Sequence, residues 1–151
     1  MTASPDHPGA HRLGHLLWEV SARTGQLGEA HLAGTPLTYP AIGLLDQIAA
    51  QPGVTIAEIA RRSPKTQQAI SQVAARLERL GYIERRVADG RSAALHLTEA
   101  GDAARTRGNA AEQEFEGRLR AALGADRYER LRALLDEARD VVVGLEEQGH
   151  G

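Results

Sequence analysis

Hydrophobic side chains recur at intervals of three and four residues along most of this 151-residue chain, which is the spacing of amphipathic helices. The spacing changes to alternate residues only between Gly81 and Thr98, which indicates β-strands. The first helical stretch runs from residue 10 to about residue 31, although glycines weaken its pattern. The Gly-Thr-Pro of residues 34–36 is expected to end this helix.

Two further helices are marked by capping residues at their starts. Thr38 offers a hydroxyl as N-cap, and Pro40 lies in the first turn, where its missing N–H costs little. This helix is expected to stop at the Gln-Pro-Gly of residues 51–53. Thr55 and Glu58 form the Thr-x-x-Glu pattern of a capping box, which predicts a short second helix to about residue 62.

The next helix, from Gln67 to about Leu80, has distinct apolar and polar faces. Thr66 can cap its start, and Gly81 follows its end, where a left-handed residue commonly closes a helix. Its apolar face is formed by Ile70, Val73, Ala74, Leu77 and Leu80. Two short helices joined by a four-residue turn predict a helix-turn-helix.

The alternating stretch that follows predicts a β-hairpin. Ile83 and Val87 share one strand face, as do Leu95 and Leu97 in the next strand. The Asp89-Gly90 pair between them favours a tight hairpin turn. The hairpin is therefore expected to be a wing attached to the helix-turn-helix.

Two longer helices complete the predicted fold. One is capped by Thr98 and runs to about residue 123, and the last spans about residues 126–147. The flanking helices carry more apolar surface than one small core can cover, so a second copy of the chain is the expected partner. The fold class is mainly α with a small β-hairpin wing. The predicted divisions are a tail at 1–9, an N-terminal dimerisation helix at 10–36, a winged helix-turn-helix DNA-binding domain at 37–98 and C-terminal dimerisation helices at 99–151.

Charge is distributed unevenly along a chain whose net charge is only −2. The stretch from Arg61 to Arg91 holds eight basic and three acidic residues, so the rest of the chain carries −7. A local positive surface within an acidic body is typical of a protein that binds phosphates, although charge also fluctuates along any sequence.

The chain has no cysteine, which excludes disulfides and thiol-based sensing. It shows no signal peptide or membrane span, and a cytoplasmic protein with no membrane partner is expected.

Three segments together resemble the MarR family of bacterial transcription regulators. They are LTYPAIGLLDQIAAQPGVTIAEIARR from Leu37, TQQAISQVAARLERLGYIERR from Thr66, and DGRSAALHLTEAG from Asp89 to Gly101. The resemblance implies a homodimer held by intertwined terminal helices, with two winged lobes that bind successive major grooves of an operator. It also implies a repressor that is released from double-stranded DNA when a small-molecule effector binds between the lobes.

The wing differs from the family pattern in two ways. The segment between Arg86 and Asp89 is about two residues shorter than in many relatives, and Ser92 stands where a basic residue often follows the wing arginine. Both differences reduce the reach and the charge of the wing. They favour an alternative hypothesis, in which the chain is a winged-helix protein-interaction or architectural module with weak or no specific DNA binding.

Candidate base contacts lie on the N-terminal half of the helix that begins at Gln67. Gln67, Gln68, Ser71 and Gln72 are the candidates, because an amide that donates and accepts can pair with adenine N6 and N7. Polar residues also occupy any exposed helix face, so each contact is only one interpretation.

Candidate backbone contacts surround that helix. Arg76 and Arg79 are expected near phosphates, although Arg79 can instead pair with Glu78, Glu84 or another helix. Ser63, Lys65 and Thr66 lie in the preceding turn, where hydroxyls and backbone N–H groups can bind phosphate. Simple capping is the alternative role for the two hydroxyls.

In the wing, Arg91 follows the turn, and the family pattern implies that it enters the minor groove. Asp89 can hold its guanidinium or close the turn. Arg85 and Arg86 are adjacent in a strand and so face opposite ways, which leaves only one of them, Arg86 in this interpretation, to face DNA.

A small-molecule site is expected where the first helix, at residues 10–31, and the long helix that begins at Thr98 meet the winged domain. His15, Trp18, His31 and Tyr39 can line it, although each is equally explained by packing, and Trp18 is expected in the core. His11 and His15 have a spacing that suits zinc, but nothing completes the ligand set, so no metal is expected. No cofactor motif and no catalytic constellation is present, and the chain is not expected to be an enzyme.

Overall fold

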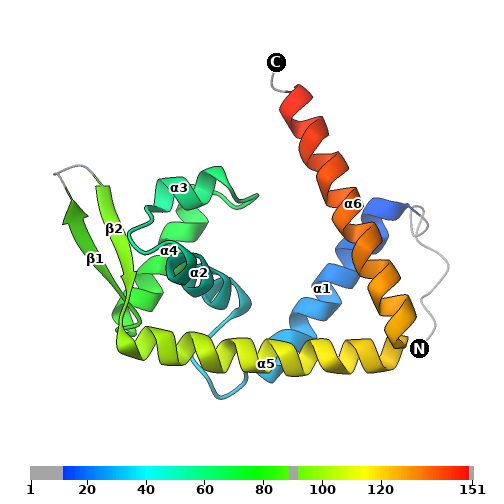
Figure 1. The fold of residues 1–151 in the computed structure, drawn as a ribbon, viewed down its shortest axis with the longest axis horizontal. Helices are drawn as coiled ribbons and strands as arrows, with labels where there is room; N and C mark the ends of the chain where they lie inside the picture. Colours follow the sequence, from blue (N-terminus) through cyan, green and yellow to red (C-terminus); the bar gives the residue numbers. More distant parts are fainter. Residues whose placement is uncertain (1–11, 89–91, 150–151) are drawn as a thin grey trace. The chain divides into compact units, whose positions relative to one another are not determined.

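The computed structural model describes residues 12–88 and 92–149, and in these residues it is helical apart from one hairpin (Figure 1). The predicted tail, His11 and the wing tip at residues 89–91 lie outside the described residues. The chain divides into two compact units, Met1–Glu112 and Gln113–Gly151. The elements are α1 (Leu13–His31), α2 (Tyr39–Ala50), α3 (Ile56–Arg61), α4 (Gln67–Arg79), β1 (Ile83–Ala88), β2 (Ser92–Leu97), α5 (Glu99–Leu123) and α6 (Ala125–Gly149).

The helix starts are confirmed at the level of individual hydrogen bonds. The Thr38 hydroxyl accepts a hydrogen bond from the Ala41 N–H at 3.4 Å, and a proline occupies the first turn of α2. At α3 the Glu58 N–H donates to Thr55 Oγ1 at 3.3 Å, while the Thr55 N–H donates to Glu58 Oε2 at 2.8 Å. The Thr55 hydroxyl also donates to Glu58 Oε2 at 2.8 Å. The backbone N–H and the hydroxyl of Thr55 lower the pKa of Glu58 below its ordinary value of 4.5, since both donors favour the charged carboxylate.

The end of α4 is closed by two backbone bonds around a glycine. Gly81 has φ of 72°, a conformation that side chains disfavour. Its N–H donates to the Glu78 carbonyl at 2.9 Å, and the Tyr82 N–H donates to the Leu77 carbonyl at 2.9 Å. This is the Schellman arrangement, and it turns the chain directly from the end of α4 into β1.

The hairpin is antiparallel, with Ile83 opposite Leu97 and Arg85 opposite Leu95. Ile83 and Leu95 are buried, so this face of the hairpin packs on the core as the alternation predicts. Val87 shares that face but is 76% exposed, because the core ends before the hairpin does. The opposite face of the hairpin, called the outer face because it points away from the core, begins with the pair of Glu84 and His96.

A backbone contact that the sequence did not indicate joins the hairpin to the turn between α2 and α3. The Gly53 N–H donates to the Leu95 carbonyl at 2.8 Å, and the Leu95 N–H donates to the Val54 carbonyl at 2.9 Å. This contact satisfies the second edge of β2 and fixes the wing against the helix-turn-helix.

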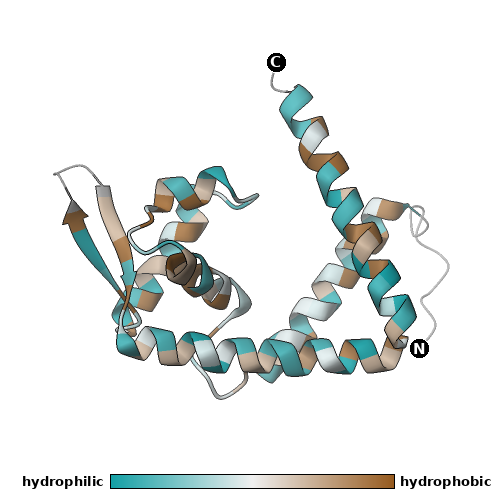
Figure 2. Cartoon of the chain, viewed as in Figure 1, coloured by the Kyte–Doolittle hydropathy of each residue, from teal (hydrophilic) through white to brown (hydrophobic). Residues whose placement is uncertain are grey.

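The core of the first unit lies among α2, α4, the hairpin and the start of α5. α2 is its most hydrophobic helix (Figure 2). Its largest fully buried side chains are Ile42, Leu45, Ile48, Leu77 and Leu95. Because α2 is covered on several sides while α4 buries only one face, α4 is left with an outer face for other contacts.

The start of α5 is locked onto this core. The Thr98 hydroxyl donates to the Gly81 carbonyl at 2.6 Å and accepts from the Gly101 N–H at 3.0 Å. Further along the helix, Asn109 Nδ2 and Arg105 Nη1 donate to Asp46 Oδ1 of α2 at 2.9 and 3.3 Å. These bonds hold α2 and α5 together. The pKa of Arg105 is raised, first by its hydrogen bond to Asp102 in its own helix and then by its bond to Asp46.

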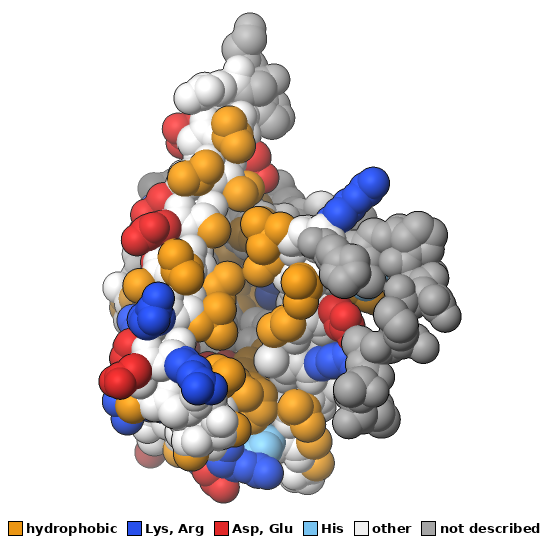
Figure 3. All heavy atoms as spheres, turned by 90° about the vertical axis from the view of Figure 1, so that its right-hand side faces the viewer, with side chains coloured by type: hydrophobic (Ala, Val, Ile, Leu, Met, Phe, Trp, Pro, Cys, Tyr) orange, Lys and Arg blue, Asp and Glu red, His pale blue; other side chains and the backbone are white. Residues whose placement is uncertain are grey.

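The terminal helices each leave apolar side chains exposed. Figure 3 shows such side chains along the C-terminal helix, with charged groups beside them. Trp18 is 67% exposed, so its expected place in the core is wrong for the single chain. The side chains concerned in α1 are Leu13, Leu16, Leu17, Trp18, Val20 and Leu27, and those in α6 are Leu131, Leu134, Leu135, Val141, Val142, Val143 and Leu145.

Candidate nucleic-acid interface

The N-terminal half of α4 presents its polar side chains outward. Gln67, Gln68 and Gln72 are exposed and Ser71 is half-buried, while Ile70 on the opposite side enters the core. Within the described residues, none of these four polar side chains has a hydrogen-bond partner. Their amides are therefore available for base edges, although base contact itself stays a prediction.

The turn before α4 is ordered by its own hydroxyls. Thr66 Oγ1 accepts from the Ala69 N–H at 3.2 Å, and Ser63 Oγ accepts from the Lys65 N–H at 3.1 Å. Thr66 thus caps α4, which was the alternative to phosphate contact, and Ser63 closes a turn of its own backbone. Each O–H still has its proton to donate, so capping and phosphate binding are compatible.

Arg76 has a partner that the sequence did not predict. Its Nη2 donates to the carbonyl of Pro36, in the linker between α1 and α2, at 3.0 Å. Its predicted phosphate contact is not tested by this bond, because a guanidinium carries five N–H donors. Arg79, its neighbour one turn away, is exposed and pairs with neither Glu78 nor Glu84 among the described residues.

The two wing arginines have different surroundings. Arg85 Nε donates to Glu78 Oε2 of α4 at 3.0 Å, from the strand face that packs on the core. Arg86 lies on the outer face and pairs with Glu84 through its Nε at 2.8 Å and through its Nη2. Adjacent strand residues do face opposite ways, and Arg86 is the one directed outward. Its exposed ion pair is weak enough to be exchanged for a phosphate.

Asp89 and Arg91 lie outside the described residues, and their predicted roles stay predictions.

Two arginines at the end of α3 were counted in the basic stretch but were not predicted as site residues. Arg62 Nη1 donates to Gln51 Oε1 at 2.8 Å, which holds it over the preceding turn. Arg61 is exposed and makes no hydrogen bond or ion pair within the described part of the chain, although its charge helps to lower the pKa of Glu58. Its place in the last turn of α3, beside the helix-turn-helix turn, makes it an additional candidate for phosphate contact.

The predicted small-molecule residues do not come together in one chain. The rings of His15 and Trp18 lie 5.8 Å apart and tilted in the first half of α1. His31 Nδ1 lies 3.0 Å from the Leu27 carbonyl at the other end, and a β-carbon on Gly28 would lie 2.0 Å from the Tyr39 ring. Since a helix rises about 1.5 Å per residue, the two groups are separated by roughly 20 Å along α1.

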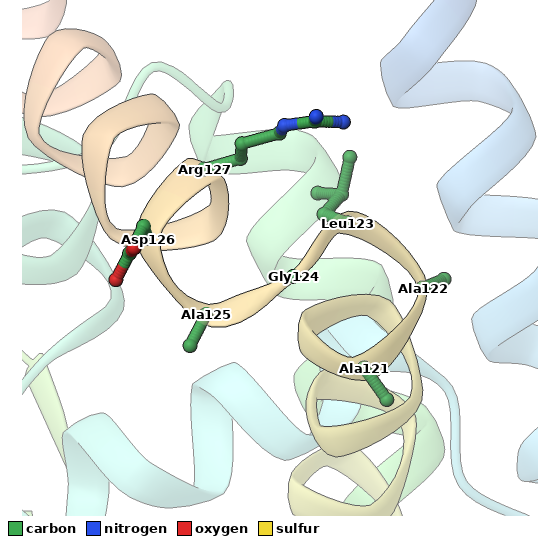
Figure 4. A pocket seen from close by; sticks show the side chains of 7 residues that line it. All are labelled: Ala121, Ala122, Leu123, Gly124, Ala125, Asp126 and Arg127. Atoms are coloured by element: carbon green, nitrogen blue, oxygen red, sulfur yellow. The ribbon is translucent and has the colours of Figure 1, made fainter.

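A shallow hollow of ≈ 480 Å³ lies at the turn between α5 and α6 (Figure 4). It is lined by seven consecutive residues, Ala121 to Arg127, and Gly124 makes the turn with φ of 83°. Figure 4 shows the Leu123 and Arg127 side chains directed to one side and Asp126 directed away. A hollow built from one turn, with no converging polar groups, is not a binding site of the usual kind.

In the part of the chain that the structure describes, no group of three or more His, Asp or Glu side chains is placed to hold a metal ion. Over the same residues, every helix is too short or too polar to cross a membrane.

Comparison with known proteins gives concordant matches. The model of the MarR family matches residues 35–92. The HTH-type transcriptional repressor Rv2887 of Mycobacterium tuberculosis is 32% identical over 127 residues, which cover 83% of this chain and 91% of that protein. The crystal structure of Rv2887 with salicylic acid matches with 31% identity and a TM-score of 0.68, covering 89% of this chain and 98% of that one. The repressor CouR bound to a 23-mer DNA duplex matches with 26% identity and a TM-score of 0.79, covering 86% and 94%.

Proposed function

The chain belongs to the MarR family, and we propose that it is a DNA-binding transcriptional repressor that acts as a homodimer and is released by a small-molecule effector. The observation that carries the proposal is the outer face of α4. Three exposed glutamine amides without partners among the described residues lie beside a basic turn, on a helix whose other face is buried. A family of transcription regulators also argues against catalysis as the main activity.

The proposed DNA contacts divide into two kinds. Gln67, Gln68, Ser71 and Gln72 contact base edges in the major groove, where an amide distinguishes adenine from the other bases. Ser63, Lys65, Thr66 and the wing residues Arg86, Asp89 and Arg91 hold the phosphate backbone or enter the minor groove. The phosphate contacts give affinity that falls with salt, whereas the base contacts give sequence preference.

The dimer is proposed from the exposed apolar side chains of the terminal helices. Residues such as Leu16 in α1 and Leu134 in α6 remain exposed in the single chain, in helices that flank the winged domain. Exposed apolar side chains gathered along a helix in this way mark an interface. A second copy would cover it and would place two α4 helices on a two-fold symmetric operator.

The effector class is proposed from the relatives. Rv2887 has been crystallised with salicylic acid and with p-aminosalicylic acid, at 31% identity to this chain in both structures. An aromatic carboxylic acid is therefore the first class to examine. Because the predicted pocket residues form two separate groups, one in the first half of α1 and one around its last turn and the start of α2, the proposed site uses one of these groups, completed by other elements or by the second subunit.

The test is a gel-shift titration of the full chain on the promoter region of its own gene at several salt concentrations. The proposal expects binding by a dimer, an affinity that falls steeply with salt, and release by millimolar salicylate but not by benzyl alcohol. Binding that is absent at low salt would favour the alternative, a winged-helix module that docks proteins. Binding that salicylate leaves unchanged would remove the effector class and keep the repressor.

A further inference from the structure

We propose that Arg76 is a positioning residue. It ties α4, the helix proposed to contact base edges, to the linker between α1 and α2, and so couples DNA binding to the position of α1. This proposal rests on the proposed DNA-binding function and assigns a role that differs from the phosphate contact expected of an exposed arginine. The observation behind it is the bond from Arg76 Nη2 to the Pro36 carbonyl at 3.0 Å, across forty residues of sequence.

The carbonyl that Arg76 binds belongs to an ordered turn. Thr35 Oγ1 donates to the Leu32 carbonyl at 2.8 Å and accepts from the Leu37 N–H at 3.2 Å. The Thr35 N–H also donates to the Leu32 carbonyl at 2.9 Å. Leu32 and Leu37 are both buried, so the linker is fixed to the core at each end. A guanidinium bound to this carbonyl is therefore held by a rigid partner.

The two halves of α4 have different surroundings. The N-terminal half carries the exposed polar side chains of Gln67, Gln68 and Gln72, which have no partners among the described residues. The C-terminal half is held on two sides, by the bond of Arg76 to the linker and by the bond of Arg85 to Glu78 at 3.0 Å. One half is thus free to contact DNA, while the other is anchored to its surroundings.

The linker is also the continuation of α1. Leu32 is the C-cap of that helix, and Gly28 in its last turn is packed so closely on Tyr39 that an added β-carbon would lie 2.0 Å from the ring. A displacement of α1 therefore moves residues 32–37 together with Tyr39, and through Arg76 it reaches α4. By linkage, DNA that fixes α4 must stabilise the linker in turn.

Salt dependence distinguishes positioning from phosphate contact. Each phosphate contact contributes about 0.9 to the slope of log affinity against log salt, and a homodimer doubles this to about 1.8. Arg76→Met is expected to weaken binding to a duplex selected from random sequences by about threefold to tenfold, with the slope unchanged. Lys65→Met is the matched control in the same lobe, and it is expected to lower the slope by about 1.8.

A second measurement tests the coupling itself. Amide hydrogen exchange at Thr35 and Leu37, whose N–H groups are bonded within the linker, is expected to slow when the wild-type protein binds the duplex. In Arg76→Met this slowing is expected to disappear, while exchange in the N-terminal half of α4 still slows. Thr35→Val changes no charge and is expected to weaken DNA binding in the same direction as Arg76→Met, again with the slope unchanged.

Three results would overturn the proposal. They are a slope that falls by about 1.8 in Arg76→Met, linker exchange that is unaffected by the duplex in the wild type, and linker exchange that still slows in the variant. Absence of salt-dependent binding by the wild-type protein to any duplex is a different outcome, since it rejects the proposed DNA-binding function on which the coupling rests.

Discussion

Replacing Gly101 with alanine tests how α5 is joined to the wing. A β-carbon at this position would lie 1.8 Å from the Tyr82 carbonyl oxygen and 2.7 Å from its carbon. That oxygen also accepts the Thr98 N–H at 3.1 Å, where the hairpin passes into α5. Because the obstacle is backbone, it cannot rotate away as a side chain can, and α5 has to shift or the bond has to break.

Two effects of opposite sign decide the result. Alanine in a helix is favoured over glycine by about 0.5–1 kcal/mol, which would stabilise the variant. Overpacking costs about 1–3 kcal/mol and more where backbone must move. Gly101→Ala is therefore expected to lower the free energy of unfolding by about 1–3 kcal/mol. For a chain of this length that corresponds to roughly 3–10 °C in Tm.

Gly43→Ala is the matched control, since Gly43 is an exposed helix glycine with no atom within 4 Å of the added β-carbon. It is expected to raise the free energy of unfolding by about 0.5–1 kcal/mol. Urea titrations followed by far-ultraviolet circular dichroism measure both variants. A Gly101→Ala protein as stable as Gly43→Ala would refute the close contact between α5 and the Tyr82 carbonyl.

Three further predictions concern the core, the capping box and base recognition. Leu77→Ala, at a side chain that is 0% exposed, is expected to lose about 2–5 kcal/mol in urea titrations, and Leu80→Ala, at 37%, less than half of that loss; equal losses would contradict the placement of α4. The lowered pKa of Glu58 stabilises the fold above its ordinary value of 4.5, and this contribution is lost as pH falls through the lowered value. Glu58→Gln keeps the cap but not the charge, so its Tm should fall less than that of the wild type between about pH 6 and pH 3; identical profiles would argue against the charge effect. Gln68→Ala is expected to relax base preference at one operator position by about 1–3 kcal/mol, as measured by competition with single-substituted duplexes, whereas a uniform loss on all duplexes would assign Gln68 to the backbone.

The helix boundaries could be predicted from the sequence because their causes are local. Thr38, Thr55 and Thr66 each cap a helix within three residues of the N–H that they accept from. Gly81 likewise closes α4 by a conformation that depends on its own backbone. The fold class followed from these local features and from the change of hydrophobic period.

The contacts that the sequence did not reveal join residues far apart in the chain. The bond of Arg76 to Pro36 and the strand-like pairing of Gly53 and Val54 with Leu95 depend on tertiary placement, which no local pattern encodes. Pairing with Glu78 was an alternative considered for Arg79, but Arg85 binds Glu78 instead, because the Schellman turn brings β1 back along α4.

The small-molecule residues illustrate a further limit. Trp18 was expected in the core, yet it lies on a helix whose apolar face the single chain leaves uncovered. The separation of His15 and Trp18 from His31 follows from the rise of a helix and could have been deduced from their numbering alone. Which of the two groups binds an effector depends on elements that a single-chain pattern does not specify.

Selection of binding sites from a pool of random duplexes tests the central claim most directly. A homodimer that presents two α4 helices is expected to enrich a pseudo-palindrome whose half-site centres lie about one helical turn, 10–10.5 base pairs, apart. Recovery of an asymmetric motif, or of no motif from a pool that the folded protein was given at low salt, would contradict the account of a dimeric, sequence-specific repressor.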